Sequence, residues 1–200
     1  MAVRNYKLIE FPIKRSFKEM SEKEAEKFLK WFVKSIPGRI EIFKKTAQNT
    51  GYDPRKLNFS PESLKYLGEW FAKRITSRKL TKNEIEKIES GIPGHLKPHV
   101  DIPKVDLSKE TLSLCYDIGM YLGETFRKNV KGLKWDFIKK PKNDIDYHKP
   151  VLVGGKIPVN PIHLVKVFAT GLLDKTYSSH RLREVYDSNI EYYFTKESKK

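Results

Sequence analysis

The fold is decided by the stretch LSLCYDIGMYLGETFRKNVKGLKWDFIKKPKNDIDYHKPVLVGGKIPVNPIHLVKVFATGLL, which runs from Leu112 to Leu173. It begins as a helix with small residues on one face and continues into an aromatic strand (133–138), a turn and a second apolar strand (151–154). Asn160-Pro161 then opens another helix, because asparagine caps a helix well and proline fits its first turn. This order predicts an α+β fold, a helix-rich single domain with a small antiparallel sheet packed against helices.

Two glycines, Gly119 and Gly123, stand four residues apart in the helix predicted for residues 109–129. A glycine inside a helix costs about 1 kcal/mol relative to alanine. The pair therefore indicates a surface where another backbone or a large ring lies close to the helix. Cys115 shares this face, and its sequence neighbours supply no cation or histidine that would activate a thiol. We expect Cys115 to be a small buried hydrophobic side chain.

Helix boundaries outside this stretch are marked by local signals. Capping boxes at Ser21–Glu24 and Thr81–Glu84 each start a helix, and Ser60-Pro61 starts another. Pro37-Gly38 is predicted to interrupt the first of these helices, because the residue before a proline disfavours helical angles. The last helix begins at Ser178 or Ser179, and its inward-facing positions are predicted to be Leu182, Val185, Tyr186, Ile190 and Tyr193.

Two segments without helical periodicity indicate the domain organisation. Residues 3–13 alternate weakly, which predicts an extended segment or an edge strand, and residues 91–106 are rich in proline and glycine, which predicts a connector. The chain thus divides into an N-terminal helical half (1–105) and a C-terminal helix-strand-strand-helix-helix unit (106–200). With 200 residues, the two parts are expected to form one continuous domain.

Composition limits the class of protein. A hydrophobic share of 38% allows a sizeable core, and a charged share of 32% is typical of a protein in water. There is no run of about 18 apolar residues, so neither a transmembrane helix nor a membrane partner is predicted. The N-terminal residues lack the uninterrupted apolar region of a secretory signal, and the single cysteine cannot form an internal disulfide. We therefore expect a cytoplasmic protein.

The chain carries 40 Lys and Arg against 25 Asp and Glu, a formal net charge of +15. Such a charge attracts polyanions, whether nucleic acid or an acidic protein surface. The lysines are scattered along the chain rather than concentrated in one run, which is typical of a solvated surface.

No metal or cofactor is predicted from the histidines and the single cysteine. His95 and His99 lie in the proline-rich HLKPH segment, where helical spacing cannot be assumed, and neither a Cys pair nor an HExxH motif accompanies them. We expect them to be surface or loop histidines.

Six residues are candidates for an interaction site: Glu124, Asp144, Asp146, Tyr147, His148 and Tyr177. Glu124 follows the small-residue face of its helix and could act as a general acid or base in a cleft, or pair structurally with Arg127 or Lys128. The DIDYH segment combines two carboxylates with a histidine, and a polar strand end explains it equally well. Both tyrosines are flanked by polar residues, so we expect them to be exposed. No catalytic constellation is evident.

Five motifs together resemble a group of bacterial proteins of about this length: SPESLKYLGEW (60–70), DIGMYLGETFRKN (117–129), LKWDF (133–137), KPKNDIDYHKPVLVG (140–154) and NPIHLVKV (160–167). The resemblance covers roughly residues 55–195. Such proteins are similar to the small cytoplasmic partners found in toxin–immunity systems. The resemblance implies a protein partner and assigns no active residues. The charge of +15 departs from the acidic character of inhibitors that block basic nucleases, so it implies an acidic target surface.

These observations favour a non-enzymatic bacterial interaction protein of the immunity type, which binds and neutralises a toxin. A basic nucleic-acid-binding protein is the alternative. A third hypothesis is an enzyme that uses Glu124 together with Asp144, Asp146 and His148.

Overall fold

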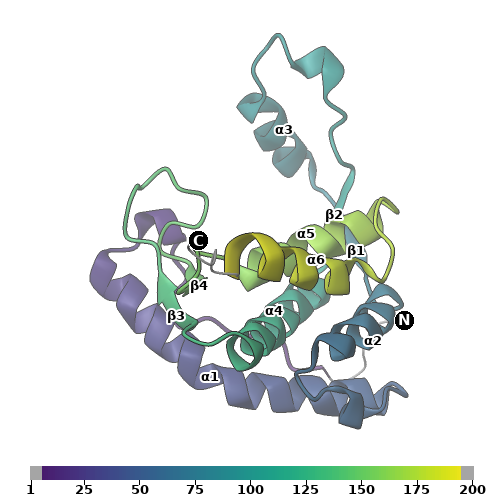
Figure 1. Cartoon of the computed structure of the whole chain (residues 1–200). Coiled ribbons are helices and arrows are strands. Elements are labelled where there is room, and N and C mark those ends of the chain that lie inside the picture. Colours follow the sequence, from purple (N-terminus) through teal and green to yellow (C-terminus); the bar gives the residue numbers. More distant parts are fainter. Residues whose placement is uncertain (1–5, 195–200) are drawn as a thin grey trace.

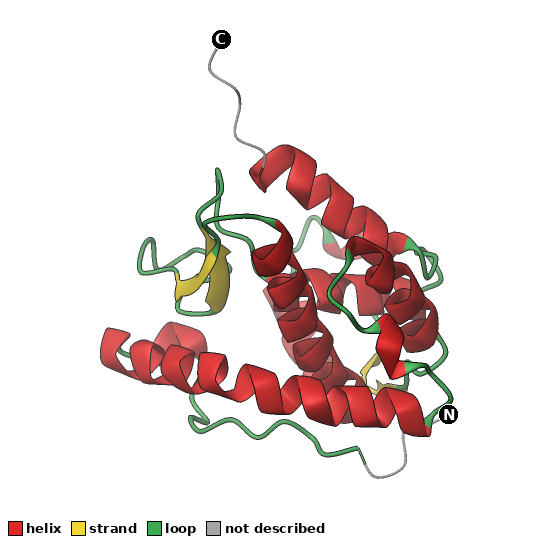
Figure 2. Ribbon diagram, turned by 60° about the horizontal axis from the view of Figure 1, so that its bottom comes forward, coloured by secondary structure: helices red, strands yellow, loops and turns green. Residues whose placement is uncertain are grey.

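The structure is a computed structural model, and it describes residues 6–194. Six α-helices lie in this part of the chain: α1 (Glu22–Asn49), α2 (Pro61–Ala72), α3 (Lys82–Gly91), α4 (Lys109–Asn129), α5 (Pro161–Leu173) and α6 (Arg181–Asn189). The strands are β1 (Ser77–Lys79), β2 (Val105–Leu107), β3 (Lys134–Phe137) and β4 (Pro150–Val153). They form two antiparallel pairs, β1 with β2 and β3 with β4. The helix-rich α+β fold is thus confirmed, and Figure 2 shows the β3–β4 pair at one side of the helices.

Helix α4 lies at the centre of the body, between α1 on one side and α5 on the other (Figure 1). The predicted close-packing surface is confirmed on its small-residue face. A Cβ atom on Gly119 would lie 2.8 Å from the Cα of Ile162 in α5, and one on Gly123 would overlap the ring of Trp135 in β3. The two glycines therefore let a helix and a hairpin approach the same central helix.

Cys115 is fully buried in α4, as predicted. Burial raises the pKa of its thiol to about 12, so the thiolate is disfavoured at neutral pH.

Helix α1 is continuous, so the prediction that Pro37-Gly38 interrupts it was wrong. Both residues are exposed, and the backbone bond that proline cannot donate is lost on the solvent side. Residues on the opposite side of the helix are buried before and after the proline, among them Phe32, Ile36 and Ile40. Burial of this stripe outweighs the local preference against helix at the residue before proline.

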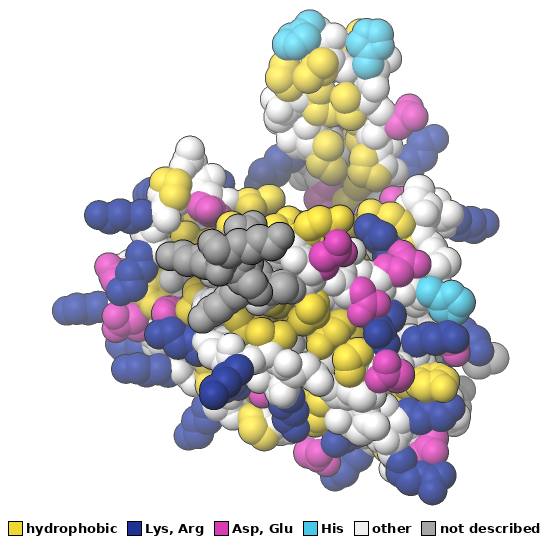
Figure 3. All heavy atoms as spheres, viewed as in Figure 1, with side chains coloured by type: hydrophobic (Ala, Val, Ile, Leu, Met, Phe, Trp, Pro, Cys, Tyr) yellow, Lys and Arg dark blue, Asp and Glu magenta, His cyan; other side chains and the backbone are white. Residues whose placement is uncertain are grey.

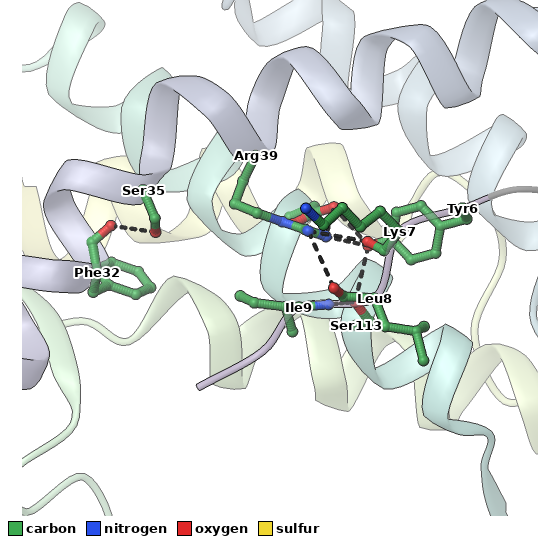
Figure 4. A network of polar contacts seen from close by, with 9 residues as sticks. Tyr6, Lys7, Leu8, Ile9, Phe32, Ser35, Arg39 and Ser113 are labelled. Carbon is green, nitrogen blue, oxygen red and sulfur yellow. Dashed lines mark hydrogen bonds and ion pairs between the residues drawn. The ribbon is translucent and has the colours of Figure 1, made fainter. Parts of the chain in front are cut away.

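The N-terminal segment from residue 6 onward is extended but pairs with no strand in the described chain. Of the two predicted options, the extended segment is therefore correct and the edge strand is not. Residues 1–5 of this prediction lie outside the described residues. Side chains hold it instead of a strand ladder (Figure 4). The backbone N–H of Ile9 donates to Ser113 Oγ (2.8 Å), and Arg39 Nη1 donates to the carbonyl of Lys7 (3.0 Å). The Tyr6 hydroxyl donates to Asp117 Oδ2 at 2.6 Å.

After α6, a change of helix type alters which side chains face the core. Helix α6 buries Leu182 and Tyr186 as predicted, and a π-helical turn (Ile190–Phe194) follows it. This wider turn places Phe194 against the core and leaves Tyr193 37% exposed, so the prediction for Tyr193 was wrong. The ring centroid of Phe194 lies 5.0 Å from that of Phe126.

Candidate functional site

The four predicted residues of the DIDYH segment lie in the loop that joins β3 to β4. Asp144 Oδ1 accepts the backbone N–H of Asp146 at 2.7 Å, which closes a local turn. Asp146 Oδ1 accepts a hydrogen bond from Asn160 Nδ2 at 2.7 Å and lies 3.5 Å from Lys149 Nζ. Because Asn160 also caps α5 through its side chain, Asp146 attaches the loop to the start of that helix.

Tyr147 and His148 stack on each other in this loop, with ring centroids 3.8 Å apart. His148 is buried and adopts a positive φ of 61°. Its Nδ1 has no hydrogen-bond partner among the residues that the structure describes. Tyr147 is half-buried because its ring packs against the imidazole of His148. The prediction that Tyr147 is exposed was therefore wrong.

Glu124 lies on α4 and is engaged by two structural partners. Its Oε1 accepts hydrogen bonds from Arg127 Nη1 (2.8 Å) and from Trp135 Nε1 (2.9 Å). It therefore fixes the indole that covers Gly123. Within residues 6–194, no contact joins Glu124 to the carboxylates or histidine of the β3–β4 loop.

Tyr177 follows α5 and packs against Gly171, where a Cβ atom would overlap its ring. The guanidinium of Arg181 lies 5.2 Å from the same ring. Tyr177 is thus half-buried rather than exposed, contrary to the prediction. The six predicted residues therefore do not form one site. The four residues of the β3–β4 loop, Glu124 and Tyr177 each make a separate set of contacts.

An extended arm was missed by the interpretation of residues 91–106 as a connector. Residues 80–104 leave the body after β1 and return at β2, and helix α3 projects away from the other helices (Figure 1). The arm begins at a short ladder in which Lys79 opposes Val105. Its helix starts at the predicted capping box, and the carboxylate of Glu84 also pairs with Arg78 at 2.8 Å.

The arm exposes apolar side chains. No residue of α3 is buried, and Ile88, Leu96 and Val100 are 37%, 42% and 43% exposed. Figure 3 shows hydrophobic side chains gathered along the arm, with histidine at its far end. The sequence did contain a signal: Ile85, Ile88 and Ile92 recur at helical spacing, yet in the structure Ile88 is exposed and the other two are only half-buried.

Charge is distributed unevenly between arm and body. Residues 80–104 contain four lysines and four acidic residues, so the whole net charge of +15 is carried by the rest of the chain. Part of it forms a row on the outer face of α1, where Lys23, Lys27, Lys30 and Lys34 are exposed at helical spacing. None of these four forms an ion pair with another described residue.

The described residues contain no group of three or more His, Cys, Asp or Glu side chains placed to hold a metal ion. Between residues 6 and 194, no helix has the length and apolar character needed to span a membrane. Comparison with known proteins gave no matching family model, no matching curated protein and no matching solved structure.

Proposed function

We propose that this protein is a non-enzymatic bacterial interaction protein of the immunity type, which neutralises a toxin by inserting the arm of residues 80–104 into it. The exposed apolar surface of the arm carries this proposal. Burial of a large aliphatic side chain contributes about 1.5–3 kcal/mol, and contiguous exposed apolar surface is typical of protein-binding sites.

The expected partner is a protein with an apolar groove surrounded by acidic residues. Ile85 and Ile88 lie on α3 with i, i+3 spacing, whereas Ile92 follows the helix with extended backbone, so the helix and the loop after it would enter the groove together. The arm has no net charge, so its entry into such a groove is not opposed by long-range repulsion from the body of the partner. The basic body attracts the acidic surroundings and accelerates association, an effect that salt screens.

Co-expression with the products of neighbouring genes, followed by capture and a binding titration, tests the proposal. Replacing Ile88 and Val100 together by aspartate is expected to weaken binding at least about tenfold, because charge is then placed where apolar surface is buried. The matched control replaces Val33 and Val167, which are 40% and 43% exposed on the body, by aspartate and should retain the affinity. Equal affinity of both double variants, or capture of no neighbouring product, would refute the proposal.

The lysine row on α1 favours nucleic-acid binding as a second candidate function. Exposed cations that form no ion pair are available to contact phosphates. This function predicts retention on DNA or RNA at about 0.15 M salt and an affinity that falls steeply as salt rises. Replacing Lys27 and Lys30 by glutamine should lower the salt dependence by about one unit of log–log slope per lost contact. A protein of matched net charge is the control, and equal retention of both proteins would exclude specific binding.

A further inference from the structure

A cavity of about 170 Å³ lies where four distant segments of the chain meet. The N-terminal segment contributes Phe17, α4 contributes Tyr116, the start of β4 contributes Lys149, and the first turns of α5 contribute Ile162, His163 and Lys166. One side of the cavity is therefore apolar and aromatic, and the other side carries amines and an imidazole.

The two lysines of the cavity differ in how their charge is balanced. Lys149 Nζ lies 3.5 Å from Asp146 Oδ1, so a carboxylate is already beside it. Lys166 is half-buried, and its Nζ lies 4.9 Å from the ring centroid of Tyr116. In the described part of the chain it has neither an ion pair nor a hydrogen bond. Burial lowers the pKa of Lys166 and the nearby charge of Lys149 lowers it further, while Cys115 and the carboxylate of Asp106 act in the opposite direction. The cavity thus holds one amine that forms no ion pair with a described residue.

The helix end beside the cavity does not supply free donors. Proline occupies the first position of α5, the N–H of His163 donates to Asn160 Oδ1 at 3.0 Å, and the backbone of Ile162 packs against Gly119. Recognition of an anion here therefore depends on side chains, and Lys166 is the cationic side chain of the cavity that forms no ion pair with a described residue.

We propose that this cavity binds a small organic monocarboxylate, with the carboxylate paired to Lys166 and the apolar body against Phe17 and Tyr116. An apolar cavity of about 150 Å³ holds a molecule as large as benzene, so the volume suits one ring or a short branched chain. A single negative charge matches the single amine of the cavity that forms no ion pair with a described residue. A dianionic phosphate would need a second free cation, and Lys149 already faces Asp146.

Titration calorimetry with benzoate, benzamide and inorganic phosphate tests the assignment. Benzoate is expected to bind at least about tenfold more tightly than its neutral analogue benzamide, because a hydrogen bond between charged groups is much stronger than a neutral one. Lys166→Met should remove this preference. Lys142→Met, an exposed lysine of the neighbouring loop, is the matched control and should bind benzoate like the wild type.

Nuclear magnetic resonance locates the bound benzoate independently of any variant. Chemical-shift changes confined to the amides around Phe17, Tyr116 and the first turn of α5 support the proposal. Shifts centred elsewhere, equal affinity for benzoate and benzamide, tighter binding of phosphate, or undiminished binding by folded Lys166→Met would each overturn it. Circular dichroism establishes that both lysine variants are folded.

Discussion

Arg39 of α1 and Asp117 of α4 form a buried ion pair through two hydrogen bonds, Nε to Oδ1 at 2.7 Å and Nη2 to Oδ2 at 2.8 Å. The side chains of the two residues are 8% and 0% exposed. The Tyr6 hydroxyl donates to the same carboxylate, so one pair joins the two longest helices and the N-terminal segment. Burial raises the pKa of Asp117, and the hydrogen bonds from Arg39 and Tyr6 act against this rise.

Removing one member of this pair should destabilise the protein strongly. Asp117→Asn or Arg39→Met leaves the other charge buried without its partner, at a cost of about 3–5 kcal/mol. Urea unfolding measures the change. The double variant Arg39→Met, Asp117→Leu should lose less than the sum of the single losses, because neither charge is then left unpaired. Additive losses would contradict the coupling.

Gly123→Ala is expected to destabilise the protein by about 1–3 kcal/mol, because the added Cβ would overlap the Trp135 ring in a packed core. Gly38→Ala is the control, since a Cβ atom there meets nothing within 4 Å in an exposed part of α1. That substitution should stabilise the protein by about 0.5–1 kcal/mol through helix propensity. Thermal unfolding compares the two, and a stabilised Gly123 variant would show that the ring does not constrain this site.

The sequence predicted correctly those features that depend on residues close together in the chain. The capping boxes at Ser21 and Thr81 mark observed helix starts, and the two glycines of α4 predicted a contact surface, because each depends on neighbouring residues or on a single face. The continuity of α1 through Pro37 could not be predicted, because it depends on burial against distant segments.

The candidate site also combines a feature that depends on neighbouring residues with one that depends on distant segments of the chain. The turn at Asp144 depends on residues close in sequence, whereas the cavity combines Phe17 with Lys166, far apart in the chain, and no sequence period connects them. The arm was missed because its isoleucines have the spacing of a core-facing helix, while no residue of α3 is buried against the body.

The base of the arm should loosen in acid. The hydrogen bonds from Arg78 and Thr81 lower the pKa of Glu84 to about 2, compared with about 4.3 for an unfolded glutamate. The stabilisation from this group is therefore fully present above about pH 4.3 and is lost as the pH falls through 2. Hydrogen exchange at the α3 amides should accelerate over this window while α4 stays protected.

Glu84→Gln should show faster α3 exchange already at pH 6, because the amide cannot pair with Arg78. Glu89→Gln, an exposed residue of the same helix without an ion pair to a described residue, should exchange like the wild type. An α3 helix equally protected in Glu84→Gln at pH 6 would mean that the capping network does not hold the arm.

The body should fold without the arm. The backbone N–H of Leu80 donates to the carbonyl of Lys104 at 3.0 Å, which continues the β1–β2 ladder by one pair. Replacing residues 81–103 with Asn-Gly joins this pair by a two-residue turn of the type that suits a tight hairpin. No α3 residue is buried and the pair of Arg78 with Glu84 lies at the surface, so the free energy of unfolding should change little. Urea unfolding measures stability, and partner capture on the same sample should show that binding is lost. A shortened chain that fails to fold would mean that the arm contributes to the core, and one that still captures the partner would place the interaction on the body.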